Sequence, residues 1–123
     1  METQLEGNLP IYMQIMDAIR LSVISGELAP GQKVSSVREL AQEFNVNPNT
    51  MQRALAELER EGVLLSERTA GRFVTKDISF IHELKMREAE KAAAEFTAKM
   101  AALGFSGEEL ACFFRDIEEG KVG

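Results

Sequence analysis

The sequence contains no tryptophan, one cysteine and one histidine, and these shortages exclude several classes of protein. Cys112 has no second cysteine with which to form an intrachain disulfide, so nothing indicates an oxidising compartment. A single histidine and a single cysteine cannot supply a structural zinc site, and we expect no metal or other cofactor. Cys112 lies in a run of apolar residues, where we expect a small buried side chain.

Long apolar runs are also missing. No stretch approaches the roughly 20 apolar residues that a membrane-spanning helix needs. The first residues lack the basic and apolar segments of a signal peptide. We therefore expect a cytoplasmic protein with no membrane partner. No Ser, His and Asp set and no phosphate-binding glycine loop indicates an enzyme.

The chain is acidic, with a net charge of −6, whereas nucleic-acid-binding domains are usually basic. The acidic excess is larger after residue 76 than before it. DNA binding would therefore require a local cluster of arginines rather than a basic surface. The candidates for this cluster are Arg38, Arg53, Arg68 and Arg72.

The segment from Val46 to Gly62 has the features of a complete helix. Asn47 can cap its start, Pro48 suits the first helical position, and Gly62 can end it in the left-handed conformation. The buried face is predicted from helical spacing to consist of Met51, Leu55 and Leu58. The opposite face carries side chains that can contact base edges or phosphates, namely Asn49, Gln52, Arg53, Ala56 and Arg60.

A shorter helix is expected directly before this one. Ser36-Val-Arg-Glu39 has the pattern of a capping box. A tight turn over residues 45–47 then leads into the longer helix. The pair fits a helix-turn-helix, whose second helix lies in the major groove of DNA. For the longer helix taken alone, an ordinary amphipathic surface helix is the alternative.

A first helix and a hairpin complete this domain. The helix is expected from about residue 9 to residue 25, and its apolar stripe consists of Ile11, Ile15, Ile19 and Val23. Two β-compatible runs, residues 63–67 and 72–75, surround a glycine-containing turn and predict a hairpin. Such a hairpin is typical of the wing of a winged helix. A hairpin that only closes the core would not explain Arg68 and Arg72 beside its tip.

The last third of the chain predicts a helical tail. One long helix is expected from about Ile78 to Leu103, followed by a short apolar helix with a capping box at Ser106. So much aromatic surface favours burial in a symmetric homodimer. Packing of the last helix onto the first domain is the alternative. The residues assigned to the dimer contact are Ile81, Leu84, Phe96, Met100, Leu110, Phe113, Phe114 and Ile117.

Six stretches within residues 9–75 share the pattern of one known family: Pro10–Ile15, Ser25–Lys33, Ser36–Ala41, Val46–Thr50, Arg53–Gly62 and Gly71–Val74. Together they resemble the N-terminal winged helix of the GntR family of bacterial transcription regulators. The tail resembles the YtrA subfamily, in which two helices replace a larger effector domain. The resemblance implies a dimeric repressor of an inverted-repeat operator. In that subfamily the regulated genes often encode ABC transporters.

The resemblance also implies roles for particular residues. Arg38 matches the arginine that enters the groove at the start of the second helix. Gly71 matches the wing glycine that lets the backbone approach the minor groove. Tyr12 matches a position that contacts a phosphate, with a plain packing tyrosine as the equal alternative. The full set of expected DNA-binding residues is Tyr12, Ser36, Arg38, Asn47, Asn49, Thr50, Gln52, Arg53, Arg68, Gly71 and Arg72.

The wing departs from the family pattern. Glu67 and Thr69 stand where basic residues and a second glycine are usual, and we expect glycine at position 69 to ease the approach to DNA. This departure and the acidic charge favour an alternative function, a winged-helix protein-interaction module without DNA binding. The residues leave open whether a small-molecule effector binds.

The sequence thus predicts a mainly α-helical protein with a small β-hairpin. Residues 1–76 are expected to form a winged helix-turn-helix domain for DNA binding. Residues 77–123 are expected to form a helical dimerisation tail. The predicted function is a sequence-specific dimeric regulator of a bacterial operon.

Overall fold

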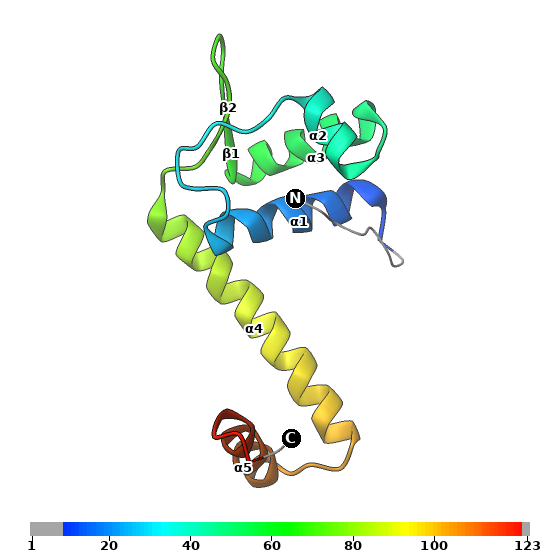
Figure 1. Cartoon of the computed structure of the whole chain (residues 1–123), viewed down its shortest axis with the longest axis vertical. Helices are drawn as coiled ribbons and strands as arrows, with labels where there is room; N and C mark the ends of the chain where they lie inside the picture. Colours follow the sequence, from blue (N-terminus) through cyan, green and yellow to red (C-terminus); the bar gives the residue numbers. More distant parts are fainter. Residues whose placement is uncertain (1–8, 122–123) are drawn as a thin grey trace. The chain divides into compact units, whose positions relative to one another are not determined.

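The computed structural model describes residues 9–121 and contains mostly helix with one small hairpin (Figure 1). This confirms the predicted fold class. Its elements, in chain order, are α1 (Ile11–Ser25), α2 (Val37–Phe44), α3 (Pro48–Glu61), β1 (Leu64–Glu67), β2 (Gly71–Val74), α4 (Ile78–Ala102) and α5 (Gly107–Glu118).

Local signals set the ends of α2 and α3 as the sequence predicts. The Ser36 hydroxyl accepts a hydrogen bond from the Glu39 N–H, and the Glu39 carboxylate accepts one from the Ser36 N–H, both at 3.2 Å. Asn47 caps α3 by accepting from the Asn49 N–H at 2.8 Å. Gly62 ends α3 at a φ of 89°, a left-handed conformation that suits glycine. The two helices therefore form the predicted helix-turn-helix.

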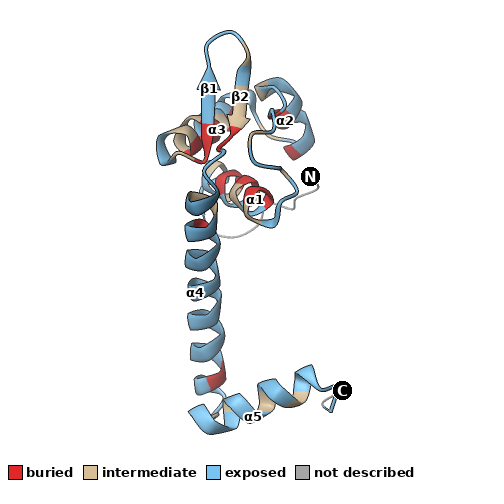
Figure 2. Cartoon of the chain, turned by 90° about the vertical axis from the view of Figure 1, so that its left-hand side faces the viewer, coloured by how far each residue is buried: buried red, intermediate tan, exposed pale blue. Residues whose placement is uncertain are grey.

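The core lies between α1, α2, α3 and the start of the hairpin, where the buried residues gather (Figure 2). Met51, Leu55 and Leu58 are fully buried, as their spacing predicts. The expected stripe of α1 needs one correction, because Ile11 is 42% exposed. Tyr12 instead packs against the core at the start of α1. Ile11 and Tyr12 are at the first turn of α1, where the stripe that faces the core includes Tyr12 and leaves Ile11 at its edge.

An ion pair ties α1 to the end of α3. The Arg20 guanidinium donates to both carboxylate oxygens of Glu61, at 2.8 and 2.9 Å, and to Asp17 at 2.8 Å. Burial by itself would lower the pKa of Arg20, but the hydrogen bonds and charges of Glu61 and Asp17 raise it. Such a two-oxygen contact also restricts the angle between the two helices.

The hairpin pairs β1 with β2 in antiparallel register, with Leu64 opposite Val74 and Glu67 opposite Gly71. Residues 32–34 add to the other edge of β2. The Val34 N–H donates to the Arg72 carbonyl and the Val74 N–H donates to the Gln32 carbonyl, each at 2.9 Å. This pairing places Lys33 beside the wing.

The chain divides into two compact units, residues 1–85 and 86–123. The first turns of α4 belong to the first unit, because Leu84 is buried in its core and Phe80 and Ile81 pack against it. Beyond them α4 is almost entirely exposed (Figure 2). Cys112 on α5 is exposed, so the expectation of a buried cysteine was wrong. A short helix buries only one side, and Cys112 lies outside it.

Candidate nucleic-acid interface

The outward face of α3 presents polar side chains near the start of the helix. Asn49, Gln52 and Arg53 are exposed, and Thr50 is half-buried. The carbonyl oxygen of the Asn47 side chain is used by the helix cap, which leaves its amide N–H groups available. This face therefore carries amide and guanidinium donors beside the positive end of the helix dipole.

Tyr12 and Arg53 meet although they belong to different helices. The guanidinium carbon of Arg53 lies 3.8 Å from the centre of the Tyr12 ring. This distance is well inside the range of a cation–π contact. The structure therefore places Tyr12 beside the exposed face of α3, in contact with a residue that the sequence also predicts to bind DNA.

The start of α2 presents Arg38 to solvent. Its neighbours Ser36 and Glu39 are engaged with each other in the capping box, which fixes the first turn of the helix. The backbone and hydroxyl hydrogen bonds from Ser36 lower the pKa of Glu39. Glu39 is thus held as a carboxylate in the cap, while Arg38 projects without an ion pair among residues 9–121.

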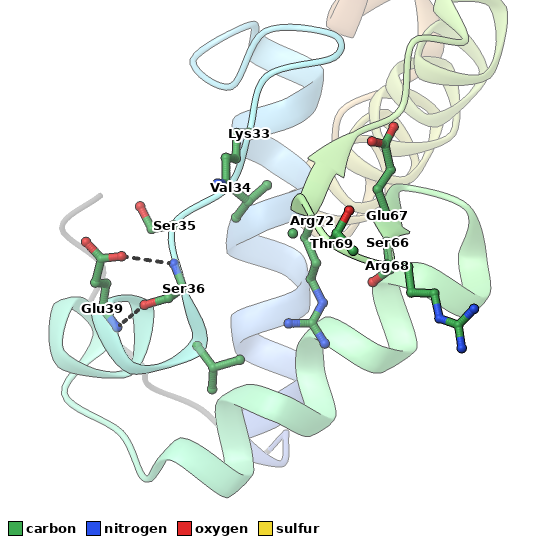
Figure 3. Close-up of a pocket in the computed structure, with 12 residues that line it drawn as sticks. Lys33, Val34, Ser35, Ser36, Glu39, Ser66, Glu67, Arg68, Thr69 and Arg72 are labelled. Atoms are coloured by element: carbon green, nitrogen blue, oxygen red, sulfur yellow. Dashed lines mark hydrogen bonds between the residues drawn. The ribbon is translucent and has the colours of Figure 1, made fainter.

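The two wing arginines have different surroundings. Arg72 donates from Nε to the Glu59 carboxylate of α3 at 2.6 Å, and its side chain is only 20% exposed. The Ser66 hydroxyl donates to the same carboxylate oxygen. Arg68 lies in the turn and is exposed. In Figure 3 the guanidinium groups of Arg68 and Arg72 lie apart. Of the two, only Arg68 therefore extends from the wing without an ion pair in the described part of the chain.

A groove of about 800 Å³ separates the wing from the start of α2 (Figure 3). One side is formed by the segment from Lys33 to Glu39, and the other by the hairpin from Ser66 to Arg72. Lys33, Ser35, Ser36 and Glu39 line the first side, and Ser66, Glu67, Arg68 and Arg72 line the second. Of the expected DNA-binding residues, Ser36, Arg68, Gly71 and Arg72 line this groove, whereas Arg38 is outside its lining.

Sequence reasoning missed two residues of this surface. Lys33 lines the groove because residues 32–34 pair with β2, and no local motif indicates that pairing. Glu59 was seen only as part of α3, yet it holds Arg72 and Ser66. The position of Glu59 near the end of α3 could have prompted a search for an arginine partner. The sequence gives no means of choosing that partner among Arg38, Arg53, Arg68 and Arg72.

The residues expected at a dimer contact divide into two groups. Leu84, Ile81 and Met100 are buried or half-buried within their own chain. Phe96, Phe114 and Ile117 are 39%, 50% and 45% exposed. Phe96 and Phe114 form an edge-to-face pair with ring centres 6.1 Å apart, and Phe105 pairs with Phe113 at 5.4 Å. Leu110 and Phe113 are half-buried.

Two other kinds of site are absent from residues 9–121. No helix there is long and apolar enough to cross a membrane. No three His, Cys, Asp or Glu side chains gather there in a way that could hold a metal ion.

Comparison with known proteins agrees with this architecture. The family model described as "Bacterial regulatory proteins, gntR family" matches residues 11–74. The chain is 37% identical over 120 residues to the HTH-type transcriptional regulator YhcF of Bacillus subtilis, covering 98% of this chain and 99% of that protein. It is 41% identical over 71 residues to the transcriptional repressor YtrA of the same organism, covering 58% and 55% respectively. This second match is consistent with the YtrA subfamily.

Solved structures show the same arrangement. A GntR family transcriptional regulator from Listeria monocytogenes superposes with a TM-score of 0.83 at 34% identity, covering 91% of this chain and 98% of that one. The DNA-binding domain of AraR in complex with operator ORX1 superposes with a TM-score of 0.55 at 31% identity, covering 58% and 93%. The chain belongs to the GntR family of bacterial regulatory proteins and is a transcription regulator, not an enzyme.

Proposed function

We propose that this regulator acts in the cytoplasm as a homodimeric repressor that binds an inverted-repeat operator. The observation that carries the proposal is the exposed polar face at the start of α3, formed by Asn49, Gln52 and Arg53. Arg38 on α2 and Arg68 in the wing are also exposed, and Arg68 lines the groove between the wing and the start of α2. The complexes of the AraR domain with operators support DNA as the ligand of this fold.

The apolar side chains that are exposed on the tail support a dimer. Four large apolar side chains of the tail are each at least 39% exposed: Phe96, Leu103, Phe114 and Ile117. So much exposed apolar surface on a short segment is typical of an interaction site. A two-fold dimer would cover them and bring two α3 helices to two half-sites of one operator. By resemblance to the YtrA subfamily, we propose an operon that encodes an ABC transporter as the target.

The test is selection of bound DNA from a random library, followed by affinity measurements on the selected sequence at several salt concentrations. We expect an inverted repeat with half-sites about one helical turn apart. Log affinity should fall linearly with log salt, by about 0.9 for each phosphate contact. A scrambled sequence of the same length is the control. No enrichment and no binding at low salt would overturn the proposal.

The alternative is a winged-helix module that binds a protein. Its support is the pairing of Arg72 with Glu59, which leaves the wing with one exposed arginine, together with the net charge of −6. This function predicts no DNA signal at low salt. The same selection therefore separates the two functions.

A further inference from the structure

We propose that Tyr12 is a positioning residue that holds Arg53 flat against its ring, so that the guanidinium reads the edge of a guanine base. This inference rests on the proposed operator binding. It replaces a direct phosphate contact by Tyr12 with an action through Arg53. The observation behind it is the distance of 3.8 Å between the Arg53 guanidinium carbon and the Tyr12 ring centre.

A guanidinium carbon only 3.8 Å from the ring centre fits a stacked contact, which uses a face of the guanidinium that carries no hydrogen-bond donor. The five N–H groups of arginine lie in the plane of the group and point outward from its edge. A ring against one face therefore restrains the side chain and leaves the N–H groups available. Two of them match the O6 and N7 acceptors that guanine presents in the major groove.

The surrounding charges do not draw Arg53 away from the ring. Glu57 lies one turn further along α3 and is the carboxylate best placed to compete. It pairs instead with Arg60, at 3.0 Å between Nη1 and Oε1. No carboxylate within residues 9–121 forms an ion pair with Arg53.

Tyr12 is itself held in place by the fold. It packs against the core at the start of α1, and its ring is half-buried. The ion pair between Arg20 and Glu61 joins α1 to α3 further along both helices. The ring is therefore a rigid support, whereas Arg53 on an exposed helix face would otherwise move among several rotamers.

The experiment measures operator affinity for the full-length parent, for Tyr12→Phe, Tyr12→Leu and Arg53→Ala, and for the double variant that combines Tyr12→Leu with Arg53→Ala. Tyr12→Phe keeps the ring and should bind within about twofold of the parent. Tyr12→Leu should bind about fivefold more weakly and lose preference for guanine at one operator position. The double variant should bind no more weakly than Arg53→Ala, because the ring acts only through the arginine. Lys91→Ala removes one exposed positive charge of α4, outside the residues assigned to DNA and to the dimer; it is the charge control and should bind like the parent.

Several results would overturn the inference. If Tyr12→Phe weakens binding severalfold while the salt slope stays unchanged, the uncharged hydroxyl contacts the DNA directly. If the two single effects add in the double variant, Tyr12 acts independently of Arg53. If Tyr12→Leu does not fold, Arg53→Lys provides the test, because it keeps the positive charge but lacks the planar guanidinium. This variant should lose the preference for guanine, and a retained preference would overturn the inference. A parent that binds no DNA would instead refute the proposed function, whereas a binding parent without coupling refutes only this inference.

Discussion

Glu59 determines which of the two wing arginines is available to a ligand. Its carboxylate accepts from Arg72 at 2.6 Å and from the Ser66 hydroxyl, so one side chain of α3 holds both strands of the hairpin. Burial by itself would raise the pKa of Glu59. The hydrogen bonds from Ser66 and Arg72 and the positive charge of Arg72 have the larger effect, and together they lower the pKa below its ordinary value. Arg72 therefore serves the structure of the wing, while Arg68 remains exposed.

The first prediction compares Arg68→Ala with Arg72→Ala. Arg68→Ala should leave the free energy of unfolding unchanged within about 0.5 kcal/mol, because the side chain is exposed. It should weaken operator binding and lower the salt slope by about 1. Arg72→Ala should lower the free energy of unfolding by about 1–3 kcal/mol, because it removes a charged hydrogen bond to the part-buried Glu59.

Chemical denaturation and operator titration at several salt concentrations check this pair. Both variants remove one positive charge, so each serves as the charge control for the other. A stable Arg72→Ala protein with a reduced salt slope would show that Arg72 leaves Glu59 to contact DNA.

The second prediction concerns pH. Since the pKa of Glu59 is lowered in the folded state, its ionised form stabilises the protein above the ordinary glutamate pKa of 4.5. This contribution should be lost as the pH falls through the lowered pKa of the folded state. Glu59→Gln should therefore be less stable than the parent at pH 7, by about 1 kcal/mol, and the difference should shrink toward pH 3. Denaturation curves of both proteins between pH 3 and pH 7 provide the measurement; a difference that grows on acidification contradicts the assignment.

At the scale of an element, the wing turn depends on one glycine. Gly71 has a φ of +106°, and a Cβ added there would lie 3.2 Å from Cε of Lys33. Asn45 is the one residue other than glycine with positive φ in the described part of the chain. Thr69 therefore does not need the left-handed conformation that favours glycine, so this backbone geometry gives no reason for glycine at position 69 to ease the approach to DNA.

The third prediction follows from this difference. Gly71→Ala should lower the free energy of unfolding by about 1–3 kcal/mol, because alanine resists that backbone conformation. Thr69→Gly, in the same turn, should change it by less than about 1 kcal/mol. Thermal or chemical denaturation of the two variants decides the point. Equal effects at both positions would mean that the turn tolerates any backbone conformation.

For the whole molecule, the boundary between the two compact units falls inside α4. Residues 78–85 complete the core of the first unit through Phe80, Ile81 and Leu84, and Leu84 is only 6% exposed. The large apolar side chains left exposed on the second unit are Met86, Phe96, Leu103, Phe114 and Ile117. The first turns of α4 therefore stabilise the winged domain, whereas the proposed association of two chains would use residues further along the chain.

The fourth prediction compares two truncations. Residues 1–85 should form a folded monomer, because they retain Leu84 and lack the exposed tail. Residues 1–76 should be less stable by about 2–5 kcal/mol, since the loss of Leu84 and its neighbours opens the core. The full chain should be a dimer.

Sedimentation gives the oligomeric state of the three proteins, and denaturation gives their stability. A dimer of residues 1–85 would place the interface in the winged domain rather than in the tail. Equal stability of the two truncations would show that the start of α4 contributes nothing to the core.

Short-range patterns in the sequence were sufficient to predict the helices and their ends. The caps of Ser36 and Asn47, the left-handed Gly62 and the spacing of Met51, Leu55 and Leu58 all act within one or two turns of a helix. Such features depend on neighbours along the chain, which the sequence presents directly. The winged helix, its hairpin and its family resemblance follow from them.

The tertiary structure alone decided how the site residues divide their roles. Glu59 meets Arg72, Tyr12 meets Arg53 and Leu84 reaches the core because elements distant along the chain pack together. The spacing of residues along the sequence does not predict such contacts, because they depend on how whole helices and strands are oriented in the fold. The sequence by itself therefore determined the helices and the candidate side chains for DNA contact, whereas packing decided that Arg72 pairs with Glu59 of α3 and that Arg53 lies against the ring of Tyr12.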